Sequence, residues 1–150
     1  MFLKISEFKK AMKSALKTSS GLFIGNVKGH FLVHASLWGV WVESIYATSK
    51  FKAAIVELIG DMPEEETCYR YRLDEKTLKM EYQVSYEDPY DKWKEAKDFA
   101  CEIPLVFYSS PHELAVYQIN SDRSYVTVLQ SYAAGMMSPA ELEVGMERMP

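Results

Sequence analysis

The side chains that could bind a metal ion are three histidines and two cysteines: His30, His34, His112, Cys68 and Cys101. His30 and His34 are four residues apart, a spacing that brings two imidazole rings together only on a helix. They lie in a segment rich in β-branched and aromatic residues, and on a strand that spacing separates them by about 13 Å. The chain has no C-x-x-C and no H-E-x-x-H motif. We therefore expect no metal site, and we interpret both cysteines as small buried hydrophobic residues.

Motifs for catalysis are also absent from the sequence. It contains no G-x-S-x-G motif, and neither cysteine lies in a recognisable active-site signature. Carboxylates cluster at residues 64–66 and 87–91, where a turn and a helix start explain them. The glycines between residues 21 and 29 lack the Gly-Lys-Ser/Thr ending of a phosphate-binding loop, and a strand follows them. We therefore predict a protein that is not an enzyme and has no cofactor.

Positive charge is concentrated in the first part of the chain. Residues 1–60 contain eight lysines and three acids, a net charge of +5, whereas residues 61–150 contain nine basic and eighteen acidic residues, a net charge of −9. The candidate nucleic-acid-binding residues are lysines on two predicted helices: Lys9, Lys10, Lys13, Lys17, Lys50 and Lys52. Such an asymmetry is typical of a basic face that contacts nucleic acid or another polyanion. The alternative is that two solvated faces of opposite sign attract each other within one fold.

Aromatic and methionine side chains are the candidates for a protein interface. Trp38 and Trp41 are three residues apart, so on a strand they point to opposite faces. They belong either to an aromatic core or to an exposed interface, where tryptophan is enriched. A capping box at residues 138–141 predicts a short C-terminal helix with one apolar stripe. The stripe consists of Leu142, Met146 and Met149, which pack either on their own domain or on a second subunit.

Composition indicates one ordinary globular domain. The chain has 150 residues, of which 48% are hydrophobic and 25% charged. No apolar run approaches the 18 residues of a membrane span, and the N-terminus does not resemble a signal peptide. Two cysteines are too few for a disulfide framework. We expect a cytoplasmic protein that does not associate with a membrane.

Hydrophobic periodicity predicts the α+β class, with one domain, a mostly antiparallel sheet, two or three packed helices and a short C-terminal helix. We expect helices at residues 6–18, with Ser6 as N-cap, at 49–60, at 88–100 and from Pro139. Strands are expected at residues 2–5, 22–27, 30–35, 39–43, 103–108, 113–119 and 125–130, with a hairpin at 67–84. The expected buried face of this hairpin contains Tyr69, Tyr71, Leu73, Leu78, Met80, Tyr82 and Val84. On its polar face, Arg70 and Arg72 can pair with Glu81.

Residues 1–84 resemble one domain of a DNA sliding clamp. The resemblance depends on the order of the elements and on three stretches, namely the hairpin NVKGHFLV at residues 26–33, the helix start SKF at 49–51 and the helix end LIGDMP at 58–63. In clamps, the helices of each domain line a ring and present basic residues to DNA phosphates. The resemblance implies that role for the six lysines named above. A clamp ring needs several such domains, and the predicted helix at 88–100 is an addition to the clamp pattern.

The sequence therefore predicts a binding protein that acts through its surfaces as a small homo-oligomer. Its expected partner is DNA or a nucleic-acid-binding protein, contacted through the lysine faces of the first two helices. A second hypothesis is an inhibitor or adaptor, of the kind that small mobile-element proteins often are, which meets a basic protein through the acidic second half. A third hypothesis is a small-molecule pocket under the aromatic sheet.

Overall fold

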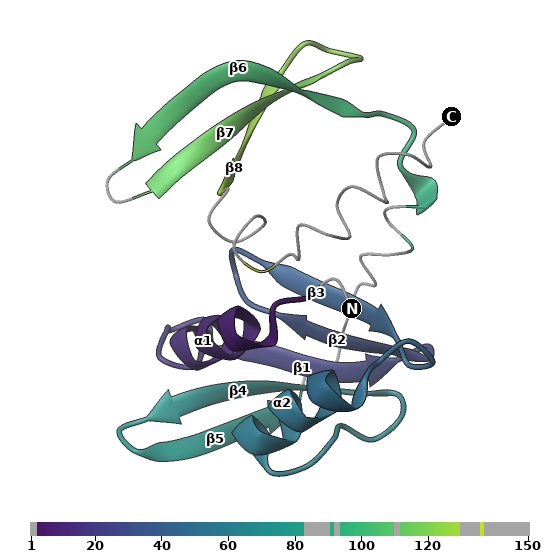
Figure 1. Cartoon of the computed structure of the whole chain (residues 1–150), viewed down its shortest axis with the longest axis vertical. Coiled ribbons are helices and arrows are strands. Elements are labelled where there is room, and N and C mark those ends of the chain that lie inside the picture. Colours follow the sequence, from purple (N-terminus) through teal and green to yellow (C-terminus); the bar gives the residue numbers. More distant parts are fainter. Residues whose placement is uncertain (1–2, 83–90, 92–93, 110–111, 130–135, 137–150) are drawn as a thin grey trace. The chain divides into compact units, whose positions relative to one another are not determined.

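The computed structural model describes residues 3–82, 91, 94–109, 112–129 and 136. The chain divides into two compact units. Unit 1 comprises Met1–Tyr86 with Ser138–Pro150, and unit 2 comprises Glu87–Met137. The described strands form one antiparallel sheet of five strands and another of three (Figure 1). The expected α+β class is confirmed, with the strands divided between two sheets.

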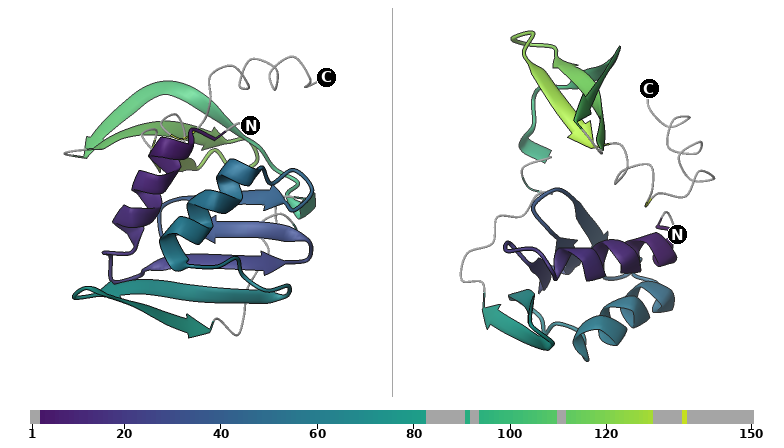
Figure 2. Two further views of the ribbon diagram at one scale, coloured as in Figure 1. Left: turned by 60° about the horizontal axis from the view of Figure 1, so that its bottom comes forward. Right: turned by 90° about the vertical axis from the view of Figure 1, so that its left-hand side faces the viewer.

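Unit 1 is a five-stranded sheet with two helices on one of its faces (Figure 2). The strand order is β3-β2-β1-β4-β5, and every neighbouring pair is antiparallel. The strands are β1 (Leu22–Val27), β2 (His30–His34), β3 (Gly39–Glu43), β4 (Thr67–Asp74) and β5 (Thr77–Tyr82). The helices are α1 (Ile5–Ala15) and α2 (Ser49–Ile59), which lie side by side.

The core of unit 1 lies between these helices and the sheet. The register places Ile24 opposite Val33 on one side and Tyr69 on the other, so these side chains share a face. From the helices, Phe8 and Phe51 are fully buried, and their rings stack with centroids 5.4 Å apart. A continuous aromatic and aliphatic core thus fixes both helices on the sheet.

The two helices begin in different ways. Thr48 is the N-cap of α2, and its hydroxyl accepts a hydrogen bond from the Phe51 backbone N–H at 3.3 Å. Gly60 ends α2 in a left-handed conformation with φ of 95°. The N-cap of α1 is Lys4, without a side-chain hydrogen bond. The predicted Ser6 cap is therefore wrong, because the helix already includes Ile5.

Other predicted limits of the first elements also need correction. Of the predicted strand at residues 2–5, Leu3 makes an isolated bridge and Ile5 is helical. The first helix ends at Ala15 rather than at residue 18, and turns follow it. The helix at 49–60 and the strands at 22–27 and 39–43 are confirmed.

The β4–β5 hairpin forms and its side chains share faces as predicted, but the expected apolar face is not buried throughout. Tyr71 is buried, whereas Met80 and Tyr82 of the same face are 59% and 58% exposed. On the opposite face Cys68 is buried with 3% exposure. Met80 and Tyr82 are exposed because β5 is the edge strand, whereas α1 and α2 cover the sheet nearer its centre (Figure 2).

Unit 2 contains a three-stranded antiparallel sheet in the order β6-β7-β8. Its strands are β6 (Ala100–Ser109), β7 (His112–Ile119) and β8 (Tyr125–Leu129), and a register shift interrupts the β6–β7 pairing between Ile103 and Val106. The predicted helix at 88–100 is wrong at its end, since residues 96–99 are not helical and Ala100 begins β6. The predicted helix from Pro139 lies outside the described residues.

Candidate nucleic-acid interface

The six candidate lysines lie on or beside the two helices of unit 1. In α1 the buried residues are Phe8, Ala11, Met12 and Ala15, so the lysines occupy the sides and the outer surface of the helix. In α2 the buried residues are Phe51, Ala54 and Ile55. Because α1 and α2 cover the same face of the sheet, their lysines belong to one layer (Figure 2). We call α1 and α2, with the flanking Lys4 and Lys17, the helical layer; its seven lysines and two glutamates give it a net charge of +5.

Two of these lysines are held by carboxylates. Lys9 of α1 forms an ion pair with Glu57 of α2, which joins the two helices. Hydrogen bonding to Lys9, and the positive charges of Lys9 and Lys13, lower the pKa of the Glu57 carboxyl group. Lys10 pairs with Glu7 one turn earlier, at 2.8 Å. These two ammonium groups are thus partly neutralised.

The other four lysines are placed differently. The Lys52 ammonium group lies 5.6 Å from the centroid of the Phe31 ring, a cation–π distance. Lys13, Lys17 and Lys50 are exposed, and within the part of the chain that the structure describes they have no ion pair. The helical layer therefore has three exposed lysines that can contact an external anion without breaking an ion pair, although Lys13 also lies close enough to Glu57 to lower its pKa.

The two candidate tryptophans have separate environments, and both are half-buried. Trp38 precedes β3, and its ring meets Phe8 of α1 edge-on at 6.2 Å. Trp41 lies within β3 opposite Leu32, and its ring stacks on His30 at 3.8 Å. Both tryptophans thus contact other rings of unit 1, and neither stands alone as an exposed anchor. The third group of candidates, Leu142, Met146 and Met149, lies outside the described residues.

The potential metal ligands are dispersed. No group of three or more His, Cys, Asp or Glu side chains among the described residues could hold a metal ion. His34 stacks on Phe23 with ring centroids 4.6 Å apart, and burial lowers the pKa of its imidazole. Burial raises the pKa of the Cys68 thiol to about 11. Cys101 is exposed, which corrects the expectation that both cysteines are buried.

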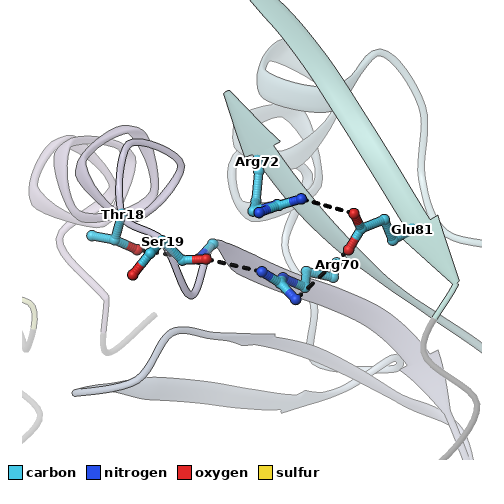
Figure 3. A network of polar contacts seen from close by, with 6 residues as sticks. Thr18, Ser19, Arg70, Arg72 and Glu81 are labelled. Atoms are coloured by element: carbon cyan, nitrogen blue, oxygen red, sulfur yellow. Dashed lines mark hydrogen bonds and ion pairs between the residues drawn. The ribbon is translucent and has the colours of Figure 1, made fainter. Parts of the chain in front are cut away.

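A polar network at the end of α1 is the feature that the sequence did not identify as a site. Arg72 donates to Glu81 at 2.9 Å, and Arg70 lies 3.6 Å from the other carboxylate oxygen of Glu81. Arg70 also donates to the backbone carbonyl of Ser19 at 2.9 Å (Figure 3). The pairing of both arginines with Glu81 was predicted from the hairpin, but the involvement of Ser19 depends on tertiary structure. The sequence signal that could have indicated this network was the placement of two arginines opposite a single acid across the hairpin.

The comparisons with known proteins do not assign the chain to a family. No protein-family model, no curated protein and no solved structure matches it. None of the helices in the described part of the chain is long and apolar enough to cross a membrane. The helical layer is therefore interpreted from its own geometry and charge.

Proposed function

We propose that this protein is a non-enzymatic binding protein whose helical layer contacts the phosphates of duplex DNA. The proposal is supported by the net charge of +5 on a layer formed by two adjacent helices. Lysines that contact phosphates bind without sequence preference, and they release counterions, so the affinity falls steeply as salt increases. The sliding-clamp resemblance of residues 1–84 points to the same surface.

The proposal depends on the exposure of Lys13, Lys17 and Lys50. All three are exposed, and within the described residues none forms an ion pair, although the charge of Lys13 acts on Glu57. Exposed ion pairs are weak and exchange readily, so Lys9 and Lys10 can add to the contact once their carboxylates are displaced. Each phosphate contact made by these lysines should increase the salt dependence of binding.

Binding of a short DNA duplex, measured by fluorescence anisotropy over a series of salt concentrations, tests the proposal. The variant with Lys13→Glu and Lys50→Glu should bind at least about tenfold more weakly at low salt and should show a shallower salt dependence. The matched control carries the same change in net charge through Lys76→Glu and Lys97→Glu, two exposed lysines outside the helical layer. It should retain most of the affinity of the wild type.

Two results would contradict the proposal. One is a wild-type protein that does not bind the duplex even at low salt. The other is equal weakening in the helical-layer variant and in the control, because that would indicate a general charge effect. Thermal melting of both variants shows whether they remain folded.

A protein-binding inhibitor or adaptor is the second candidate, and an observation in unit 2 favours it. Val106, Tyr108, Val126 and Val128 share one face of the three-stranded sheet and are 44%, 80%, 42% and 38% exposed. Glu102 and Glu113 lie on this face as well. The described residues of unit 2 include six acids and three Lys or Arg residues, a net charge of −3. An apolar surface bordered by carboxylates fits a protein segment with both apolar and basic side chains.

Substitution of this face separates the two candidates. Tyr108→Ser with Val126→Thr should abolish binding to a basic protein partner and leave DNA binding unchanged if unit 2 carries the partner site. If DNA binding is lost instead, the assignment of DNA to the helical layer is wrong. A homo-oligomer remains a prediction, which sedimentation of the wild-type chain would test.

A further inference from the structure

A cavity of about 400 Å³ that is open to solvent lies at the surface where α1 ends and β4 meets it. Its lining includes Lys17, Thr18, Ser19, Arg72, Leu73 and Asp74. The backbone N–H of Leu73 donates to the carbonyl of Leu16 at 2.8 Å, which joins the strand to the end of the helix. Small-molecule sites commonly have volumes of about 300–1,000 Å³, so this cavity can hold a ligand or part of one.

Positive charge exceeds negative charge around the cavity. Arg70 and Arg72 share the single carboxylate of Glu81 (Figure 3). Lys17 has no ion pair among the described residues. Asp74 is the carboxylate on the lining, and it is paired with Lys79, which lowers its pKa. One guanidinium charge and the Lys17 ammonium charge are therefore left without a carboxylate in this part of the structure.

The loop that contributes Lys17 is held in place by hydrogen bonds. The Thr18 hydroxyl donates to the Ala15 carbonyl at 2.7 Å and accepts from the Gly21 backbone N–H at 3.2 Å. Arg70 ties the Ser19 carbonyl to β4. A lining that is already ordered loses little conformational entropy when a ligand binds.

We propose that this cavity binds a phosphate group, with Lys17 and Arg72 as its cationic contacts. The Arg72 guanidinium group already donates to Glu81, so it would supply positive charge and its remaining donor to a phosphate, and Lys17 would supply a mobile point charge. The Ser19 hydroxyl on the lining adds a neutral donor. The phosphate has two potential sources, a nucleic-acid backbone and a small phosphorylated molecule. The first source rests on the proposed function, and the second is independent of it.

The experiment is a titration of the ¹⁵N-labelled protein with inorganic phosphate, followed by NMR on the arginine Nε–Hε groups and the amides of Thr18 and Ser19. Sodium chloride at equal ionic strength corrects for general salt effects. Lys17→Gln should weaken phosphate binding by about tenfold or more, since a charge-assisted hydrogen bond is lost. Lys97→Gln is the matched control, because it removes the same charge from an exposed lysine that lies outside the helical layer and does not line this cavity.

Competition identifies the source of the phosphate. A nucleoside monophosphate that displaces inorganic phosphate more strongly than a DNA duplex indicates a small ligand, and the reverse order indicates a nucleic-acid backbone. The proposal is overturned if phosphate causes no more change than chloride, or if Lys17→Gln and Lys97→Gln bind phosphate equally. Duplex binding that depends on Lys13 and Lys50 while the cavity fails to bind phosphate would leave the proposed function standing. Phosphate binding at Lys17 without duplex binding would retain this inference and reject the proposed function.

Discussion

Unit 1 and unit 2 are both built from antiparallel strands with many apolar side chains, yet they bury these side chains very differently. In the described part of the chain, the large side chains with less than 2% exposure are Phe8, Met12, Leu22, Ile24, Leu32, Val33, Phe51 and Ile55 in unit 1, and Val116 in unit 2. Unit 1 has α1 and α2 over one face of its sheet (Figure 2). These helices cover the face that carries Leu22, Ile24 and Val33, whereas Leu32 lies on the opposite face in register with Trp41. The helical cover thus explains most of the burial in unit 1.

Strand β5 shows the same effect inside unit 1. Leu78, Met80 and Tyr82 alternate with charged residues as regularly as the residues of a buried strand do. Met80 and Tyr82 are nevertheless more than half exposed. Alternation identifies which side chains share a face, but another element must cover that face before burial stabilises it.

The largest expected effect tests the contrast between the two units directly. Phe51→Ala should destabilise unit 1 by about 3–5 kcal/mol, because the ring is fully buried and stacks on Phe8. Phe107→Ala in β6, where the ring is 57% exposed, should cost less than about 1 kcal/mol. Urea denaturation followed by NMR on amides of β1 and β7 reports each unit separately. Equal losses of unfolding free energy in the two variants would contradict the difference in burial between unit 1 and unit 2.

The second test asks whether the close packing of unit 1 extends to the junction between α1 and β1. Gly21 has a φ of +73°, and an added Cβ would lie 2.6 Å from the Tyr71 carbonyl oxygen. Gly29 has a similar φ of +76°, but an added Cβ would meet nothing within 4 Å. Gly21→Ala should therefore cost about 2–3 kcal/mol, and Gly29→Ala about 1 kcal/mol, in urea denaturation. Similar losses would show that backbone strain alone acts at both positions.

Local patterns in the sequence predicted much of the fold of unit 1. The periodicity at residues 49–60 and the turn at Lys28 and Gly29 specify α2 and the β1–β2 hairpin, and both elements form. The errors occur where a long-range contact decides the outcome. The polarity of the hairpin at residues 67–84 could not reveal that β5 is an edge strand. The predicted end of the helix at 88–100 was wrong because Ala100 pairs with Ile119 of β7.

The candidate site was predicted only in part. Helical spacing correctly placed five of the six lysines on two helices, because spacing alone determines a helix face, whereas Lys17 lies in the turn after α1. The pairing of Lys9 with Glu57 joins residues 48 positions apart, so no local pattern could show it. The cavity beside Lys17 also depends on the meeting of α1 with β4, which are adjacent in space but distant in sequence.

A third test compares the two helix starts and has a smaller expected effect. Thr48→Ala removes the hydroxyl that accepts from the Phe51 N–H, so it should destabilise unit 1 by about 1 kcal/mol. Ser6→Ala should change the stability by no more than about 0.5 kcal/mol, since Ser6 lies inside α1 and does not cap it. The same urea measurement checks both variants. A larger loss for Ser6→Ala would show that α1 begins at the residue predicted from the sequence.

The smallest expected effect concerns the face of the unit 1 sheet that carries Phe23 and His34. Burial lowers the pKa of His34 below 6.5, so the unfolded chain binds more protons than the folded chain between these two pKa values. His34 makes its full contribution to the free energy of unfolding above its unfolded pKa. This contribution decreases as the pH falls from the unfolded pKa to the folded pKa. Urea denaturation of unit 1 at about pH 7 and about pH 5.5 should therefore show a loss that is smaller in His34→Gln. An equal loss in both proteins would indicate that this face of unit 1 is as open to water as the sheet of unit 2.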